Sequence, residues 1–553
     1  MKKFIIIDFE IKSYVGHYFT LADNIAKEAY KRGYEVSVLT NTEFSKFTKD
    51  VTNKNYTVYP IGSLSKGDGI NEGALTGFKK FIKKTFRFLV RGSIKTIIRF
   101  VFPRRHSFNL CCGLTSKSTG RIKNHFAENP IDLHDIILFQ TYTPESKCIL
   151  EVLSILNKNE VQSKISLYLH NFPKDGFKRQ FKKYLNYYKQ LDDLNINYYA
   201  TTQGVASSYN NYLMNEVKTL PYIDNKFQIN HEIKKDHRKI CICYIGAAWQ
   251  RKGYVLLPQV INLPSNYLTY LEFVFQSNAI FELPVKKTFK YLSNISLDNI
   301  WLLENELSST EYIDLFSKAD IILCLYSRCD YYFKASGIFN EAISHGIPVF
   351  LTAGTYMHFE IVRVIHQNNL KLKKKVKVID TFNLLKDKQL NKAISLNFNN
   401  LLEHKGVHNL FFHYSYEKNK TFDCLELTVI FYYKRKICHK IKELLAPGID
   451  ILEGSFLVKN PINADKMKVR ISNLGKFDNV LLKTFNMDIW SSKEKLPLSS
   501  IAGVVYDTKD IQLKLQDMID FSPHYRSTCK EFSKSFSKRH SVEHFLKIIE
   551  GTN

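Results

Sequence analysis

The chain has 553 residues and a formal net charge of +26 at pH 7. That length is too great for one ordinary core and predicts two or three domains, while a hydrophobic content of 44% excludes wholesale disorder. No run of 18 or more apolar residues is present, which argues against a spanning helix. The charge excess calls for a polyanionic partner: nucleic acid, an anionic membrane face or phosphate-bearing substrates.

The cysteines and the N-terminus bear on the compartment. The ten cysteines show no regular pairing, and "MKKFIIIDFEIKSY" turns charged after a short apolar run, unlike a secretory signal. We therefore expect free thiols in a reducing, cytoplasmic setting.

The first predicted elements form an α/β series. Residues 2–9 are expected to be a buried strand, and 19–40 a helix that stops at Gly33 and a second strand, which together make a βαβ unit and imply a parallel sheet. Later strands of that sheet are expected in 131–141, 164–172, 195–209 and 217–227. The polar stretch 230–239 then reads as a linker.

A second α/β series follows the linker. Its expected elements lie in 240–261, 269–277, 299–327 and 334–350. Residues 366–497 instead alternate like antiparallel strands with turn signals between them, and 501–523 return to strand-loop-helix form. The fold class predicted is therefore α/β, with two Rossmann-like domains facing a cleft and a β-rich insertion.

The predicted domain boundaries follow from these patterns. The first domain covers 1–229 and includes a basic amphipathic insertion, 62–128. The second covers 240–365 and 498–530 around the insertion 366–497, and a C-terminal helix, 531–553, crosses back to the first domain. A carbohydrate-binding role for 366–497 is no better supported than a structural or oligomerising one.

Four stretches resemble the GT-B class of glycosyltransferases, in particular glycosyltransferase family 4. They are "YIGAAWQRKG", "LSSTEYIDLFSKADIILCLY", "SGIFNEAISHGIPVF" and "IAGVVYDTKD". The resemblance covers roughly 1–60, 130–365 and 498–553, by order of elements more than by identity. It implies that the second domain binds a nucleotide sugar, that the first holds the acceptor, and that neither a metal nor a further cofactor is needed.

The helix expected after Ser336 is the first candidate site. Ser336 suits an N-cap, and Gly337 lets the backbone approach a phosphate closely at the positive end of the helix. Glu341 then lies one and a half turns in, where its carboxylate can accept hydrogen bonds from ribose hydroxyls. Gly346 ends the helix. The alternative is that Glu341 is a solvated helix carboxylate.

Arg251 and Lys252 are the next candidates, with Lys252 also a catalytic one. A departing diphosphate gains charge as the glycosidic bond breaks, so fixed cations stabilise the transition state more than the ground state. The alternative is an Arg-Lys pair on a solvated loop. The arginine that the family usually carries just after the strand glycine is absent, because Ala247 stands there.

Two histidines are candidate catalytic residues of the first domain. Gly16, a candidate substrate-binding residue, and His17 follow the first strand, while His170 ends a later strand, with Asp175 in the next loop. A histidine there can hydrogen-bond an acceptor or a phosphate. The alternative for each is a structural hydrogen bond. The three histidines in 404–413 lack further ligands at zinc spacing, so no metal site is expected.

The family pattern is broken at one position. It carries two glutamates separated by seven residues, and the earlier position is occupied by Phe333. Asp330 is a possible displaced carboxylate. The departure leaves open which sugar is used and whether the anomeric configuration is retained.

The stretch 78–106 contains ten Lys or Arg and no acid. On a helix its aromatic and aliphatic residues share one side and its cations the other, which fits an anionic lipid interface. A domain helix with a solvated basic face is the alternative. Nucleic-acid binding is disfavoured because no RNA-binding signature is present.

The sequence therefore predicts a peripheral membrane glycosyltransferase of the cytoplasmic face. It would move a sugar from a nucleotide sugar to a glycan or lipid-linked glycan in bacterial surface polysaccharide synthesis. A nucleotide-sugar isomerase of the same class and a non-catalytic glycan-binding protein are the alternatives.

Overall fold

The computed structural model describes most of the chain. The described residues are 1–13, 17–47, 55–63, 113–142, 147–170, 191, 194–210, 213, 216–223, 239–278, 280–295, 297–373, 378–390, 393–398, 409–416, 425–445, 453–459, 464, 466–473, 480–490, 501–505 and 507–552. They divide into two compact units. Unit 1 comprises Met1–Ala200, Tyr209–Lys218 and Leu546–Asn553, and unit 2 comprises Thr201–Ser208 and Thr219–Phe545.

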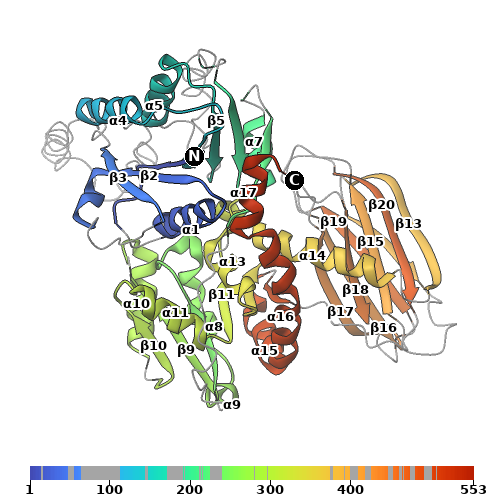
Figure 1. Cartoon of the computed structure of the whole chain (residues 1–553). Helices are drawn as coiled ribbons and strands as arrows, with labels where there is room; N and C mark the ends of the chain where they lie inside the picture. The colour runs from blue at the N-terminus through green and yellow to red at the C-terminus, as the bar shows by residue number, and fades with distance from the viewer. Residues whose placement is uncertain are drawn as a thin grey trace, which may run out of the picture. The chain divides into compact units, whose positions relative to one another are not determined.

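Unit 1 is built on a seven-stranded sheet, sheet 1, with the order β3-β2-β1-β4-β5-β6-β7 (Figure 1). The pairs from β3 to β6 are parallel. The elements that precede β8 in the chain are β1 (Lys3–Asp8), α1 (His17–Lys31), β2 (Glu35–Asn41), η1 (Thr42–Phe47), β3 (Thr57–Gly62), α4 (Ser116–Glu128), β4 (Ile136–Tyr142), α5 (Lys147–Lys158), β5 (Lys164–Leu169), β6 (Ile196–Ala200), α7 (Gln203–Asn210) and β7 (Val217–Thr219), of which α7 belongs mostly to unit 2. The strand order reverses between β1 and β4, which is where ligands bind in open α/β sheets.

Local sequence explains these elements. The run Phe4–Ile7 is buried on both faces of the sheet, as expected for an inner parallel strand. In α1 the buried positions Leu21, Ile25 and Ala29 recur every four residues, and Gly33, with φ of 86°, follows the helix.

Unit 2 contains a six-stranded parallel sheet, sheet 2, with the order β10-β9-β8-β11-β12-β21. Its strands and helices up to the insertion are β8 (Ile240–Tyr244), η3 (Gln250–Lys252), η4 (Tyr254–Leu256), α8 (Leu257–Ile261), α9 (Ser265–Leu268), β9 (Leu271–Gln276), α10 (Leu283–Ser293), β10 (Ile300–Leu303), α11 (Ser309–Lys318), β11 (Ile321–Cys324), α12 (Arg328–Tyr331), α13 (Gly337–Ser344), β12 (Val349–Thr352) and α14 (Tyr356–Lys373). After the insertion come β21 (Ala502–Val505), η5 (Thr508–Asp510), α15 (Ile511–Asp520), α16 (Ser522–Arg539) and α17 (Val542–Glu550).

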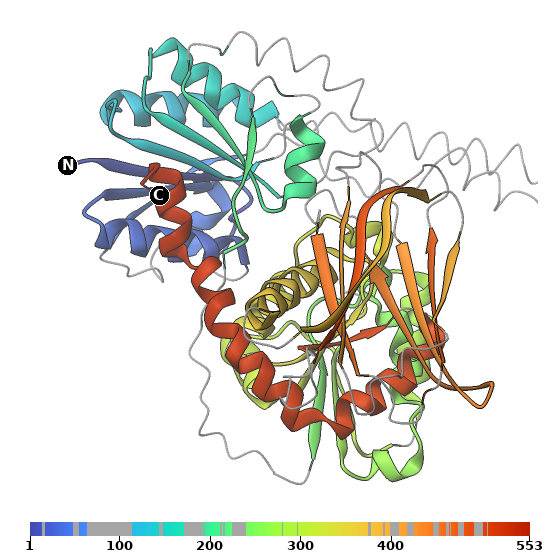
Figure 2. The same ribbon diagram turned by 90° about the vertical axis from the view of Figure 1, so that its right-hand side faces the viewer.

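The insertion is a β-sandwich of two four-stranded antiparallel sheets, whose strands can be followed from yellow to orange in Figure 2. Sheet 3 has the order β13-β20-β15-β18, and sheet 4 has the order β14-β19-β16-β17. The strands are β13 (Val378–Leu390), β14 (Ile394–Phe398), β15 (Asn409–Tyr416), β16 (Leu425–Tyr433), β17 (Lys436–Leu445), β18 (Glu453–Lys459), β19 (Lys466–Asn473) and β20 (Val480–Trp490). Alternate residues of both sheets meet in one apolar core that includes Phe412, Val429, Val469 and Met487.

The helix α14 joins sheet 2 to the sandwich. It begins just after β12 and runs on to Lys373, so the β-rich part of the insertion starts at Val378 and not at 366. Near its end, His366 Nδ1 lies 2.9 Å from Ser455 Oγ, and Lys373 pairs with the buried Asp488 at 2.7 Å. The outer face of sheet 3 is therefore covered by α14.

These observations confirm the predicted fold class: two Rossmann-like parallel α/β sheets with a β-rich insertion. In the described ranges, no helix combines the length and the hydropathy that crossing a bilayer requires. The described cysteines form no disulfide.

Candidate functional site

The loop after β8 is held in one conformation at the carboxyl edge of sheet 2. Gly246 has φ of 102°, and its N–H donates to Gln276 Oε1 at 2.6 Å. Gly253 has φ of 80°, and a Cβ there would overlap the carbonyl oxygen of Leu325. Both positions require glycine, because L-residues rarely adopt this backbone and Gly253 also lies against a neighbouring strand end.

This loop places two cations beside an aromatic ring. The guanidinium carbon of Arg251 lies 4.1 Å from the ring centroid of Trp249, and Lys252 Nζ lies 5.4 Å from it. A cation over a tryptophan face is stabilised by the ring quadrupole. The ring therefore positions both charged groups without neutralising either of them.

The ammonium of Lys252 is in a poorly solvated, cationic environment. Burial, followed by the charges of Arg251 and Lys334, lowers its pKa to about 8 against an opposing effect of Glu341. Both Arg251 and Lys252 are half-buried, whereas the alternative interpretation predicts a fully solvated pair. Three cations act on one another here, and a bound anion would relieve their mutual repulsion.

Helix α13 begins next to these cations. Ser336 is its N-cap, and its Oγ accepts from Phe339 N at 3.3 Å. A Cβ added at Gly337 would meet no atom nearer than Tyr222 Oη at 3.6 Å, so space remains in front of the first turn. The apolar face, including the fully buried Phe339 and Ala342, fixes the helix on sheet 2. The free N–H groups of the first turn make this end suited to an anion.

Glu341 is buried on this helix. It is 7% exposed, and its Oε2 accepts a short hydrogen bond from the hydroxyl of Tyr312 on α11. Burial, followed by the charge of Glu341, raises the pKa of Tyr312 well above its ordinary value, so the phenol stays protonated and donates. The alternative that Glu341 is a solvated carboxylate is wrong.

Phe333, at the position where the sequence resemblance implies a glutamate, is held by packing. The backbone oxygen of Phe333 accepts from Thr202 Oγ1 at 2.7 Å, and a Cβ at Gly204 would overlap the Phe333 ring. Asp330 is exposed on α12. The carbonyl of Ala247, where the family carries arginine, accepts from Tyr244 Oη at 3.1 Å. Position 333 therefore carries a packed aromatic ring and no carboxylate.

Unit 1 has a different group at the carboxyl edge of its sheet. Asp8, at the end of β1, is 2% exposed, and its Oδ1 accepts from Glu10 N at 2.9 Å and from Thr141 Oγ1 at 2.5 Å. Its Oδ2 accepts from Gln140 Nε2 at 3.2 Å. Burial raises the pKa of Asp8 to about 7 despite these bonds. The carboxyl group therefore changes its charge near neutral pH.

Of the two candidate histidines of unit 1, the structure describes the contacts of His170 alone. His170 Nε2 lies 2.8 Å from the backbone oxygen of Gln140, and its ring centroid is 4.5 Å from that of Tyr168. His170 therefore has the structural hydrogen bond that the sequence left as the alternative, and a catalytic role for it stays a prediction. His17 is the first residue of α1, and Gly16 lies outside the described residues.

Other predicted features also lie outside the described residues. These are Asp175 and the basic stretch 78–106. Within the ranges that are described, no group of three or more His, Cys, Asp or Glu side chains is placed to hold a metal ion.

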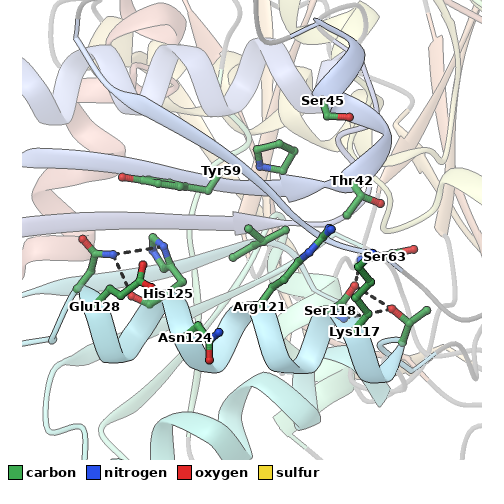
Figure 3. A pocket seen from close by; sticks show the side chains of 14 residues that line it. Thr42, Ser45, Tyr59, Ser63, Lys117, Ser118, Arg121, Asn124, His125 and Glu128 are labelled. Carbon is green, nitrogen blue, oxygen red and sulfur yellow. Dashed lines mark hydrogen bonds between the residues drawn. The ribbon is translucent and has the colours of Figure 1, made fainter.

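Unit 1 also has an open hollow of about 1050 Å³ along β3 and α4 (Figure 3). Arg121 and Lys117 lie one turn apart on α4 and line it together with Thr42 and Ser63. Tyr59 and His125 line the other end, with ring centroids 4.5 Å apart. Its cations are exposed, so the hollow is a shallow polar groove and not an enclosed site.

Sequence reasoning missed several groups of these sites. Tyr312 lies within a stretch singled out for its resemblance, yet only the packing of α11 against α13 shows that it contacts Glu341. Trp249 lies two residues before Arg251, with Gln250 between them, and an aromatic residue near an Arg-Lys pair was the available signal. Asp8 was visible as an acid that ends an apolar strand.

Comparison with known proteins finds similarity to this chain in solved structures alone. No family model matches the sequence, and no curated protein does. Among solved structures, the N-terminal domain of Candida albicans trehalose-6-phosphate phosphatase is similar, at 13% identity and a TM-score of 0.42, over 66% of this chain and 84% of that one. Sucrose-phosphate synthase from Thermosynechococcus elongatus (11%, 0.39, 66% and 84%) and a glycosyltransferase from Rickettsia africae ESF-5 (10%, 0.38, 64% and 79%) are also similar. At these scores the likeness does not decide the activity, which has to be argued from the residues.

Proposed function

We propose that the chain is a glycosyltransferase of the GT-B class that takes its sugar from a nucleotide sugar bound at the carboxyl edge of sheet 2. The observation that supports this most is the convergence of Arg251, Lys252 and the capped start of α13 on the same edge as the buried Glu341. Cations and free N–H groups suit a diphosphate, and a buried carboxylate suits ribose hydroxyls.

Each step of the proposed reaction can be described with the groups that act in it. The bond between the anomeric carbon and the diphosphate oxygen breaks, and its electron pair stays on the diphosphate. Arg251 and Lys252 stabilise this growing charge more than they stabilise the bound donor, which lowers the barrier. The acceptor oxygen forms the new glycosidic bond, and its proton passes to an oxygen of the departing diphosphate. Resemblance to family 4 favours retention of configuration, but Phe333 removes the family's first glutamate from this position.

The acceptor and the location belong to the same proposal. We propose a glycan or lipid-linked glycan acceptor, in bacterial surface polysaccharide synthesis, held at the cytoplasmic face of a membrane by the basic stretch 78–106. The cations Arg251, Lys252 and Lys334 take over the role that a metal ion has in other transferases, so no metal or further cofactor is required. Cosedimentation with anionic but not neutral vesicles, lost when 78–106 is deleted, tests the membrane part.

A non-catalytic glycan-binding protein is the second candidate. The observation in its favour is Phe333, which fills the expected carboxylate position with an aromatic ring packed on Gly204. Such a protein would bind nucleotide or glycan without releasing nucleoside diphosphate. Release that depends on an added acceptor separates the two, and it also excludes an isomerase, which needs no acceptor.

The binding claim is tested by a thermal-shift screen of the whole chain against UDP, GDP, ADP and CMP and their common sugars. A ligand that binds only the native state raises the unfolding temperature by mass action. We expect a shift for one base that is lost in Glu341→Gln, because the amide cannot accept hydrogen bonds from ribose at both atoms. Glu272→Gln, on β9 of the same sheet, is the matched control and should keep the shift.

A further inference from the structure

The β-sandwich presents one covered and one open face. Sheet 3 lies against α14 through contacts such as Asn369 Nδ2 to Ser455 Oγ at 3.3 Å. The outer face of sheet 4 has no such cover in the described part of the chain. The inner residues of sheet 4, among them Val429 and Val469, fill the core, so their neighbours along each strand must face outward.

The open face is strongly cationic. Its outward positions on β19 are Lys466, Lys468 and Arg470, and Lys440 of β17 lies two strands away in register with Ile430. Lys440, Lys466 and Arg470 are exposed, and Lys468 is half-buried. The acid that the described part of this face carries is Glu426, and Thr428 Oγ1 donates to it at 3.3 Å.

The register sets no carboxylate directly opposite the cations of β19. Lys468 lies between Asn397 of β14 and Ile430 of β16, and Arg470 lies between Ser395 and Thr428. Solvated antiparallel faces commonly set opposite charges across strands, which stabilises the pair. No carboxylate partner of these four cations occurs among the residues that the structure describes. Such a row is suited to a partner that supplies the negative charge.

We propose that the outer face of sheet 4 binds an acidic polysaccharide. Successive outward side chains on β19 are about 7 Å apart along an extended strand, so the row can follow a linear chain carrying repeated carboxylates. The exposed hydroxyl of Ser395 and amide of Asn397 lie beside these cations and can hydrogen-bond sugar hydroxyls.

The other polyanions fit less well. Single-stranded nucleic acid is bound by rows of stacking aromatic side chains, whereas the outward aromatic positions described here amount to Tyr432. A lipid interface requires an apolar stripe that enters the acyl region. The apolar outward positions described here, Ile430, Tyr432 and Ile437, gather at one end of the β16–β17 pair, and Lys440 lies directly opposite Ile430. The inference does not need the donor site, so it can succeed or fail independently of the transferase proposal.

The test uses the full-length protein and isothermal titration calorimetry. The probe is polygalacturonate, compared with neutral dextran, single-stranded oligothymidylate and phosphatidylglycerol vesicles. We expect polygalacturonate to bind at about 50 mM salt and to weaken sharply at about 500 mM, where charges are screened. Dextran should not bind.

Two triple variants with the same change in charge separate this face from general basicity. Lys466→Gln with Lys468→Gln and Arg470→Gln should weaken polygalacturonate roughly tenfold or more. The control replaces Lys286, Lys287 and Lys290 of α10 by Gln and should bind like the wild type. An unchanged thermal unfolding midpoint shows that the strand variant folds, and Arg470→Glu provides a second variant on the same strand.

Equal binding by both triple variants would overturn the proposal. So would tighter binding of oligothymidylate or vesicles than of polygalacturonate through the same residues, because the class of partner would then be wrong. Loss of polygalacturonate binding in the strand variant, with nucleotide binding retained, would establish the face as a separate glycan site.

Discussion

Sheets 1 and 2 share one topology and differ in charge at the same edge. In both sheets the strand order reverses at the first strand. The charged candidate residues lie at the carboxyl end of that strand or in the loop that follows it. Sheet 2 places Arg251 and Lys252 there, with Glu341 buried nearby. Sheet 1 places the buried carboxyl of Asp8 there, held by Gln140 and Thr141.

This difference shows that the topology supplies a position and the side chains supply the function. A cationic edge with free helical N–H groups suits a polyanion such as a diphosphate. A buried carboxyl with a pKa of about 7 suits a neutral hydroxylic partner or a proton transfer. Under the proposed function unit 2 would hold the donor and unit 1 the acceptor, and the charge at each edge can be tested by substitution.

The largest expected effect is that of Lys252→Gln. Removing a desolvated cation that faces a diphosphate leaves the anion uncompensated, so nucleoside diphosphate affinity should fall about 100-fold. Calorimetric titration measures this directly. Lys286→Gln, an exposed lysine on α10, is the control and should not change the affinity. Equal affinities in the two variants would move the diphosphate away from η3.

The second prediction concerns pH at the edge of sheet 1. The folded pKa of Asp8, about 7, is above its ordinary value of 3.8, so the native state binds the proton more tightly than the unfolded state. The raised pKa of Asp8 stabilises the native state below pH 4, and this stabilisation is lost as pH rises to 7 and beyond. Asp8→Asn has no such group, so its free energy of unfolding should rise by about 2–3 kcal/mol relative to that of the wild type between pH 5 and pH 8.

Chemical denaturation of both proteins at the two pH values measures that difference. The groups that act on Asp8 or lie beside it are Glu10, Tyr18, Thr141 and Gln140, and their own titrations occur in both proteins and cancel. A difference between variant and wild type that does not change with pH would show that Asp8 is already ionised at pH 5.

The third prediction is a proton uptake at the donor edge. The pKa of Lys252 is about 8, and a bound diphosphate should raise it, so binding at pH 8 should take up roughly half a proton. Binding enthalpies in buffers with different heats of ionisation report this number. The dependence on buffer should disappear in Lys252→Gln. Identical enthalpies in all buffers for the wild type would place the phosphates elsewhere.

The smallest expected effect is a difference between two glycine variants at the carboxyl edge of sheet 2. Gly246→Ala should cost about 1–2 kcal/mol of stability because φ is 102°, and it should weaken nucleotide binding because its Cβ would lie 3.0 Å from Lys252 Nζ. Gly337→Ala should leave stability nearly unchanged and weaken nucleotide binding alone. Thermal unfolding and titration of both variants test this, and a stability loss confined to Gly337→Ala would contradict the assigned geometry.

Much of the fold was predictable because its signals are local. The capped start at Ser336, the stop at Gly346 and the apolar face of α13 are all visible within one short stretch, and the structure has them in place. The alternation of strands in the insertion was visible for the same reason. The end of α14 was missed because its polar last turns are held by contacts with Ser455 and Asp488, which are distant in sequence.

The site was predictable only in part, because burial and pairing depend on tertiary contacts. The sequence could place Glu341 on a helix but could not tell a solvated carboxylate from one bonded to Tyr312. It could mark Asp8 as the end of a strand but not show that Gln140 and Thr141 surround it. Phe333 was recognised as a departure, and its packing on Gly204 appears only in the folded unit.

The central claim is that the carboxyl edge of sheet 2 binds a nucleoside diphosphate. The most direct measurement is a crystal structure of the whole chain with the nucleotide that the thermal-shift screen selects. We predict that the diphosphate contacts Lys252 and the first turn of α13 and that the ribose hydroxyls contact Glu341. A nucleotide bound away from these residues, or none bound at saturating concentration, would contradict the account.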